Sequence, residues 1–254
     1  MGLRFKETVQ AVTPPLIYDA MQRWWWNRAA VGPVGGEPLD AEGAALGHRE
    51  AVGGLWDQIG QLQLDFLLQQ GLQPQHRLLD VGCGSFRGGV HLIRYLQDGN
   101  YYGIDASADL LRAGRECELP RYGLTDRTLH VLCNDQFEFQ RLGEGFDIAL
   151  AQSVFSHLPW NSILRCLVNM GKVLSVEGRF YATFFHDPGG RHRISPLVHS
   201  PGGITTYPDR DPYHYELDVF EDLARRAGLS VQFWGDWQHP RNQQMLVFRR
   251  ASAR

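Results

Sequence analysis

Short apolar runs alternate with amphipathic segments through most of the chain. From His48 to Gln70 the apolar residues recur at intervals of three and four, which predicts one amphipathic helix ended by Gly71. The same spacing predicts further helices at 88–96, 107–116 (with Ser107 as N-cap), 161–174 and 215–227. Compact apolar runs predict strands at 78–81, 101–104, 129–133, 146–151, 179–185, 229–235 and 245–250.

Two stretches lack this alternation. Residues 1–47 contain Pro14-Pro15 and Gly35-Gly36, which interrupt every helical pattern, so we expect an N-terminal extension that packs on the main domain. Its tryptophans, Trp25 among them, either pack at the edge of the core or help to close a lid over a ligand. Residues 186–214 show no periodicity and are too long for an ordinary connection, so we expect an irregular insertion there.

Five alternations of strand and helix predict the fold. We expect an α/β domain over residues 48–254, with a doubly wound, mainly parallel, seven-stranded, Rossmann-like sheet and an antiparallel final strand. The insertion would follow the fifth strand. In such sheets the ligand binds beyond the carboxyl ends of the strands. Polar residues stand at those ends: Asp80, Asp105, Asn134, Asp135, Gln152 and His186.

A glycine-rich turn follows the first predicted strand, in the sequence RLLDVGCGSFRGG from Arg77 to Gly89. A strand that runs into such a turn and then a helix brings backbone N–H groups close to a ligand. A dinucleotide site needs a third glycine, but Arg87 stands at that position and would obstruct a pyrophosphate. Asp80 adds an anion, which favours a cationic or amine-bearing ligand. A nicotinamide-dependent enzyme is the alternative, and titration with NADH would reveal it.

Composition narrows the class of protein. The net charge of −3 argues against wholesale binding of nucleic acid. No apolar run approaches the length of a membrane span, and the N-terminus lacks the apolar core of a signal peptide. The cysteines are widely spaced, which suggests neither a zinc site nor a disulfide framework. We therefore expect a cytoplasmic protein without a metal, membrane or nucleic-acid partner; the oligomeric state is not indicated.

Four motifs in order resemble those of the class I S-adenosylmethionine-dependent methyltransferases. Asp80-Val-Gly82-Cys-Gly84 resembles their first motif, Tyr102-Gly-Ile-Asp105 the second and Cys133-Asn134-Asp135 the third. The stretch from Phe146 to Pro159 is similar to the region around their fourth strand. The resemblance covers roughly residues 48–185. Many members have a third glycine where Phe86 stands, so Gly88 or Gly89 would have to serve instead.

The resemblance implies S-adenosyl-L-methionine as the cofactor. Glycines 82 and 84 would approach its methionine part, with Asp80 directed toward the amino group and Gln152 on the same side. Asp105 would accept both ribose hydroxyls, and Asp135 the adenine amino group. The full set of expected cofactor-binding residues is Asp80, Gly82, Cys83, Gly84, Asp105, Ala106, Asn134, Asp135, Gln136 and Gln152.

The acceptor side is less specific. A hydroxyl nucleophile gains from a base, most often histidine, and His186 with the adjacent Asp187 is the first candidate. His157 is the second candidate, although it could instead cap the next helix. The insertion is the expected acceptor flap. The residues expected to bind substrate are Trp25, Arg191, Tyr207, Tyr213 and Tyr215.

The sequence therefore predicts a metal-independent O-methyltransferase of a small molecule, with a sugar-containing or secondary metabolite as the acceptor. It lacks the Asn-Pro-Pro-Tyr type of signature that indicates amino methylation of bases, since Gln152-Ser-Val-Phe155 stands there. Two alternatives stay open. One is an N-methyltransferase of a small molecule, and the other is a cofactor-binding module without catalysis.

Overall fold

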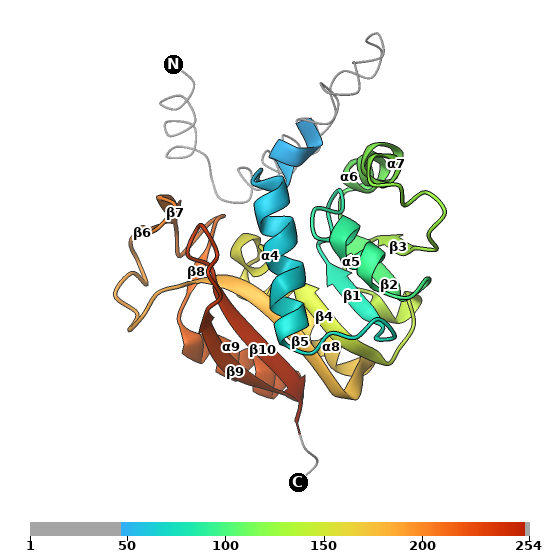
Figure 1. The fold of residues 1–254 in the computed structure, drawn as a ribbon. Helices are drawn as coiled ribbons and strands as arrows, with labels where there is room; N and C mark the ends of the chain where they lie inside the picture. The colour runs from blue at the N-terminus through green and yellow to red at the C-terminus, as the bar shows by residue number, and fades with distance from the viewer. Residues whose placement is uncertain (1–46, 252–254) are drawn as a thin grey trace.

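The computed structural model describes residues 47–251 and shows a twisted sheet with helices on both faces (Figure 1). The predicted N-terminal extension, with Trp25, lies outside the described residues. Within the described range, no helix is long and apolar enough to cross a lipid bilayer.

The sheet has the strand order β3-β2-β1-β4-β5-β10-β9. These strands are β1 (Leu78–Val81), β2 (Tyr101–Asp105), β3 (His130–Cys133), β4 (Phe146–Ala151), β5 (Leu174–His186), β9 (Leu229–Asp236) and β10 (Gln244–Arg250). Neighbours from β3 to β5 pair in parallel, whereas β10 is antiparallel to both β5 and β9. The doubly wound sheet with an antiparallel final strand is thus confirmed. The direction of winding reverses between β1 and β4, which makes that junction the switch point.

The two faces of the sheet are covered by different helices. Successive strand residues point to opposite faces, so Leu78 belongs to one apolar cluster and Leu79 to the other. The first cluster contains residues of α4 (Trp56–Gln69), α5 (Gly89–Tyr95) and α6 (Ala108–Ala113); the second contains residues of α8 (Trp160–Val173) and α9 (Leu217–Arg226). Both clusters extend to the carboxyl ends of the strands, so the polar edge rests on a packed core.

The prediction of a single helix over residues 48–70 is wrong. Residues 47–51 form one helical turn, residues 52–55 form a turn, and α4 begins at Trp56. Gly53, Gly54 and Leu55 have φ angles of 92°, 62° and 48°, in the left-handed region that an α-helix cannot include. The apolar spacing continues across a break that the glycine pair enforces.

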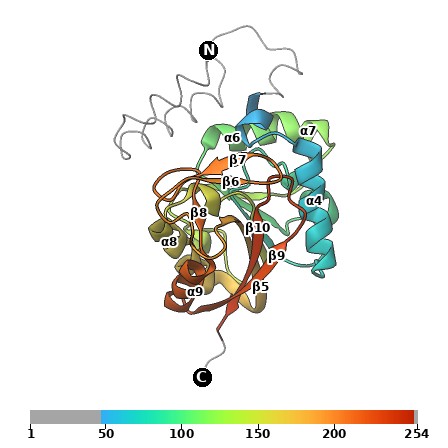
Figure 2. The same ribbon diagram turned by 90° about the vertical axis from the view of Figure 1, so that its left-hand side faces the viewer.

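The insertion 186–214 is more regular than predicted. It contains the antiparallel pair β6 (Leu197–His199) and β7 (Ile204–Thr206), and β8 (His214–Tyr215) adds an eighth strand to the main sheet by pairing with the end of β5. Both ribbon views place the β6–β7 pair at the same end of the sheet as the 47–51 turn and α6 (Figure 2). This is the end at which the parallel strands terminate.

The other predicted elements are present with shifted ends. The helix capped by Ser107 continues beyond Glu116 as the π-helix η1 (Gly114–Glu118) and α7 (Leu119–Arg121). Ser107 acts as the N-cap, with its Oγ accepting a bond from the Leu110 N–H. β5 begins at Leu174, five residues before its predicted start at Arg179. Short 3-10 turns, η2 (Phe139–Arg141) and η3 (Phe155–His157), flank β4.

Phe86 occupies the position of the missing third glycine and adopts a backbone conformation that is typical of glycine. Gly82 and Gly84 have φ angles of 72° and 53°, and Phe86 itself adopts a φ of 70°. Its side chain is fully buried and meets Tyr101 edge to face, with ring centroids 6.2 Å apart. A Cβ on Gly114 would lie 2.6 Å from the Phe86 ring, so the π-helix packs directly against this ring. Aromatic packing thus holds a backbone conformation that glycine adopts without strain.

We predict that Phe86→Ala lowers the free energy of unfolding by about 3–5 kcal/mol, because alanine leaves a cavity and does not relieve the left-handed backbone. Phe233→Ala is the control, since Phe233 on β9 is 37% exposed, and it should cost clearly less. Urea denaturation followed by circular dichroism measures both. Equal losses in the two variants would contradict the role given to Phe86.

Candidate cofactor and acceptor site

The polar residues predicted to meet at one edge do so. Asp80 lies in β1, directly before its last residue, and Asp105 is the last residue of β2. Asn134 and Gln152 directly follow β3 and β4, and His186 ends β5. Because these strands are parallel, their carboxyl ends share one edge of the sheet.

Asp105 connects two segments of this edge. Its Oδ2 accepts a hydrogen bond of 2.8 Å from the Gly84 N–H, and its Oδ1 accepts one of 2.8 Å from the Ser107 N–H. The N–H groups of Gly82 and Cys83 bond to the Ile104 carbonyl beside it. Burial raises the pKa of Asp105, and the bonds from the Ser107 and Gly84 N–H groups oppose that rise. The carboxylate therefore fixes the glycine loop relative to β2.

Asp80 is buried beneath the same loop. It is 4% exposed, and the Tyr101 hydroxyl donates a bond of 2.7 Å to its Oδ2. Burial raises the pKa of Asp80 to about 7, although the Tyr101 hydrogen bond acts in the opposite direction. A cationic group nearby would favour the ionised form of this carboxyl group.

The turn after β3 holds the residues expected near adenine. Asn134 Oδ1 accepts bonds from the N–H groups of Gln136 and Glu138, and the Asn134 N–H donates to the Asp105 carbonyl. Gln136 Nε2 donates to Asp135 Oδ1, and both side chains are exposed. Ala106 is also exposed, and its carbonyl lies 3.7 Å from Cys133 Sγ. The residues expected from the third motif thus form one hydrogen-bonded turn beside Asp105.

Gln152 belongs to a buried polar network that the sequence did not reveal. Its Oε1 accepts a bond of 2.7 Å from Arg87 Nη2, and its Nε2 lies 2.7 Å from Ser153 Oγ and 3.2 Å from His239 Nε2. Arg87 is only 6% exposed and His239 only 3%. Arg87 appeared in the sequence only as a bulky residue, and no pattern marks His239.

The expected acceptor residues fall into two groups. Tyr213 and Tyr215 stack at 6.0 Å, the Tyr213 N–H bonds to the Ser156 carbonyl, and the Tyr215 hydroxyl bonds to the Leu158 carbonyl. They therefore lie against the segment that carries His157. Arg191 and Tyr207 belong to other parts of the flap. Arg191 is exposed, and the Arg210 guanidinium lies over the Tyr207 ring, 4.0 Å from the ring centroid.

The two histidines proposed as bases have different surroundings. His157 Nδ1 lies 2.5 Å from Asp211 Oδ1. Desolvation lowers the pKa of His157, but the charge of Asp211 and its hydrogen bond outweigh this effect and raise it. His186 packs against the Phe184 and Phe233 rings, and burial lowers its pKa. Asp187 is buried and accepts a bond from the His192 N–H, so it holds the flap backbone.

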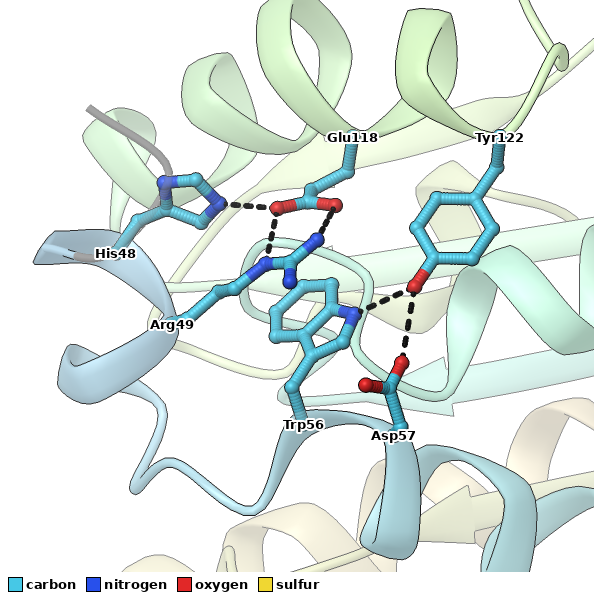
Figure 3. A network of polar contacts seen from close by, with 6 residues as sticks. All are labelled: His48, Arg49, Trp56, Asp57, Glu118 and Tyr122. Atoms are coloured by element: carbon cyan, nitrogen blue, oxygen red, sulfur yellow. Dashed lines mark hydrogen bonds and ion pairs between the residues drawn. The ribbon is translucent and has the colours of Figure 1, made fainter. Parts of the chain in front are cut away.

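A second polar network attaches the 47–57 segment to the sheet domain (Figure 3). Glu118, on η1, accepts bonds from His48 at 2.6 Å and from two Arg49 nitrogens at 2.7 Å each. Trp56 Nε1 donates to the Tyr122 hydroxyl at 3.0 Å. A Cβ on Gly84 would lie 2.7 Å from Val52 Cγ1, so the attached segment covers the glycine loop closely.

Known proteins show the same sequence features and the same architecture. Residues 79–180 match the family model described as "Methyltransferase domain". This stretch is therefore a methyltransferase domain, in agreement with the predicted resemblance to the class I S-adenosylmethionine-dependent methyltransferases. The predicted enzyme class and cofactor, S-adenosyl-L-methionine, are thereby confirmed.

Solved structures with low sequence identity share the fold. Magnesium protoporphyrin IX methyltransferase from Synechocystis PCC 6803, with bound S-adenosylhomocysteine, is 16% identical, with a TM-score of 0.59 over 92% of this chain and 99% of that chain. A putative O-methyltransferase from Nostoc punctiforme PCC 73102 is also 16% identical, with a TM-score of 0.59 over 94% and 70%. The pyocyanin biosynthetic protein PhzM is 17% identical, with a TM-score of 0.58 over 98% and 68%.

The polar groups at the edge fit this methyltransferase cofactor. Asp105 has acceptor oxygens for a ribose diol, and Asp135 is an exposed carboxylate suited to an adenine amino group. Gly82 is exposed and has no side chain to keep a ligand from its backbone. Asp80 would ionise toward an ammonium group. These roles would place the cofactor across the ends of β1, β2 and β3.

We predict that Asp105→Asn weakens binding of S-adenosylhomocysteine at least about tenfold. The asparagine Nδ2 would face a backbone N–H, either of Gly84 or of Ser107, and the lost charge-assisted bond is worth about 1.5–3 kcal/mol. Titration calorimetry measures the affinity. Asp98→Asn is the control, because Asp98 also accepts a backbone N–H, that of Thr128, in the loop before β2. Unchanged affinity in Asp105→Asn would exclude Asp105 from the cofactor site.

A second prediction concerns proton release. Because the pKa of Asp80 is raised to about 7, the free protein holds a proton there below that pH. A bound ammonium group stabilises the carboxylate, so binding of S-adenosylhomocysteine at pH 6.5 should release up to about one proton. Calorimetry in two buffers of different ionisation enthalpy measures this release. The release should vanish in Asp80→Asn and decline above pH 7; release that persists in the variant would come from another group.

Proposed function

We propose that the protein O-methylates a small-molecule acceptor, with His157 as the general base and Asp211 as its positioning residue. The observation that carries this proposal is the 2.5 Å contact between His157 Nδ1 and Asp211 Oδ1, at the end of the sheet that carries the cofactor residues. Asp211 belongs to the flap, so the flap and the strand edge each contribute one member of the pair.

The contact determines what His157 can do with a proton. A carboxylate that accepts from Nδ1–H leaves the lone pair of the neutral imidazole on Nε2. His157 Nε2 has no hydrogen-bond partner among residues 47–251, and the side chain is 45% exposed. The imidazole can therefore take a proton from an acceptor hydroxyl at Nε2, while Asp211 stabilises the resulting cation.

His157 is a better base than His186, the first candidate from the sequence. No side chain among the described residues hydrogen-bonds to His186, and its neighbour Asp187 is directed to the His192 N–H. Burial lowers the pKa of His186, whereas Asp211 raises the pKa of His157, which makes the His157 imidazole the stronger base. His186 and Asp187 remain testable as the alternative pair.

When bound, S-adenosylmethionine supplies an electrophilic methyl group on a sulfonium. The protein's own residues then position the acceptor: the Tyr213–Tyr215 stack lies against the segment that carries His157 and fixes that segment relative to the flap. The names of the putative O-methyltransferase and of the pyocyanin biosynthetic protein support methyl transfer to small molecules. We include in the proposal a single domain over 48–254, a cytoplasmic location and no nucleic-acid partner.

The class of acceptor is tested by release of S-adenosylhomocysteine with matched panels of phenols, sugars and amines. Hydroxyl compounds should be methylated. Preference for amines would establish an N-methyltransferase instead, and cofactor binding without turnover on any panel would favour the non-catalytic module.

We predict that His157→Ala lowers kcat about 10²-fold or more on the acceptor found in this way, with the affinity for S-adenosylhomocysteine unchanged. Asp211→Asn should lower kcat and also shift the acidic limb of the pH–rate profile to lower pH. The sign follows because Asp211 raises the pKa of His157, so its removal lets the imidazole lose its proton at lower pH.

The control is His130→Ala, since His130 is exposed and begins β3 at the opposite edge of the sheet. His186→Ala decides between the two candidates. Loss of turnover in His186→Ala, with His157→Ala active, would transfer the role to His186 and contradict the proposal.

A further inference from the structure

Two arginines are held side by side where the cofactor residues meet the flap. Arg87 follows the glycine loop, and Arg241 lies in the turn between β9 and β10. Arg87 Nη1 donates to the Gly54 carbonyl at 2.8 Å, and Arg241 Nη2 donates to the neighbouring Gly53 carbonyl at 2.6 Å. A Cβ on Gly53 would lie 2.9 Å from Arg241 Nη1 and 3.8 Å from Arg87 Nη1, so both guanidinium groups pack against the same glycine. Desolvation and then the charge of Arg241 lower the pKa of Arg87 to about 10.

The described residues provide no carboxylate within ion-pair distance of either guanidinium. The hydrogen-bond acceptors of Arg87 and Arg241 are neutral: two backbone carbonyls and Gln152 Oε1. Asp80 acts on Arg87 only through the longer-range electrostatic interaction, and its raised pKa of about 7 makes it a partial charge near neutrality. A buried cation beside another cation is costly unless an anion accompanies them.

The neighbouring network also has more donors than acceptors. His239 Nδ1 accepts a bond from the Arg241 N–H, so the proton of the neutral ring is on Nε2 and points at Gln152 Nε2, 3.2 Å away. Rotating the Gln152 amide by half a turn would satisfy His239 but would place an NH₂ group against Arg87. One N–H group is therefore in excess in either arrangement.

Arg241 also relates this cluster to the proposed base. It is only partly buried, and it packs against the flap, because a Cβ on Gly202, in the turn between β6 and β7, would lie 2.7 Å from Arg241 Cα. Its charge lowers the pKa of both Arg87 and His157. Its Nε and Nη1 have no hydrogen-bond acceptor among residues 47–251. A guanidinium with two free nitrogens presents the planar pair of donors that binds a carboxylate in bidentate fashion.

We propose that Arg241, supported by Arg87, binds a carboxylate group of the acceptor, so that the small molecule methylated by this protein is an acid. This inference rests on the proposed function and specifies its substrate class. The acceptor is favoured over the cofactor as the source of the carboxylate because Arg241 lies in the β9–β10 turn and packs against Gly202 of the flap, whereas Asp105 and Asn134 stand at the ends of β2 and β3.

The experiment measures binding, so it needs no turnover and no identified acceptor. The protein is saturated with S-adenosylhomocysteine, and ligand-observed NMR titrations compare benzoate with benzamide, its neutral counterpart. Benzoate should bind at least about tenfold more tightly than benzamide. This preference should disappear in Arg241→Met and be reduced in Arg241→Lys, which keeps a donor for the Gly53 carbonyl but loses the planar pair.

Arg225→Met is the matched control, because Arg225 is an exposed arginine on α9, and it should keep the preference for benzoate. Thermal melts check that each variant folds. Equal or absent binding of benzoate and benzamide by the folded wild-type protein would overturn the inference, as would an Arg241→Met variant that binds benzoate normally.

A second comparison separates the two sources of a carboxylate. 5′-Methylthioadenosine lacks the amino-acid end of the cofactor. If Arg241→Met weakens S-adenosylhomocysteine about tenfold and leaves 5′-methylthioadenosine unchanged, the carboxylate belongs to the cofactor and the inference about the acceptor fails. That result would not affect the proposal that His157 is the base for O-methylation. Conversely, turnover that does not depend on His157 would not affect the proposed carboxylate site at Arg241.

Discussion

The hydrogen bonds between Asp105 and two backbone N–H groups are the interaction on which the site depends. The loop after β1 and the turn after β2 come from different strands, and one carboxylate joins them. Without it the three left-handed positions of the loop, at Gly82, Gly84 and Phe86, would be held only by local packing and by the bonds that the Ile104 carbonyl accepts. The loop is therefore a composite of two strands, and its shape requires their parallel register.

The polar groups along this edge of the sheet differ between its two halves. At the ends of β1, β2 and β3, the side chains expected to bind the cofactor are carboxylates and amides, which would accept its hydrogen bonds. Beyond β4, toward β5 and the β9–β10 turn, histidines and Arg241 are joined by the carboxylates of Asp187 and Asp211. Gln152 lies at the boundary and accepts a bond from Arg87.

The features that the sequence predicted are those that local pattern determines. Asp80, Asp105, Asn134 and Gln152 could be located because each stands at or next to the end of an apolar strand, and parallel strands bring such ends together. The pairing of His157 with Asp211 could not be predicted, because 54 residues and a flap without periodicity separate them. Arg87 was visible only as a departure from a glycine motif, since its partners at Gly54 and Gln152 are set by tertiary packing. The helix break at 52–55 was missed because the apolar spacing continues through two glycines.

Glu118 has a consequence for how the covering segment can move. Its side chain is fully buried, and its described partners, His48 and Arg49, come from the segment that packs on Gly84. Moving that segment away would break the His48 and Arg49 contacts of Glu118, and breaking a buried ion pair costs about 3–5 kcal/mol. Stepwise separation of residues 47–57 from the π-helix is therefore disfavoured, because both contacts of Glu118 would be lost together. If a ligand enters and leaves where residues 47–57 cover the glycine loop, its exchange would require rare openings of this whole segment instead of continuous small fluctuations.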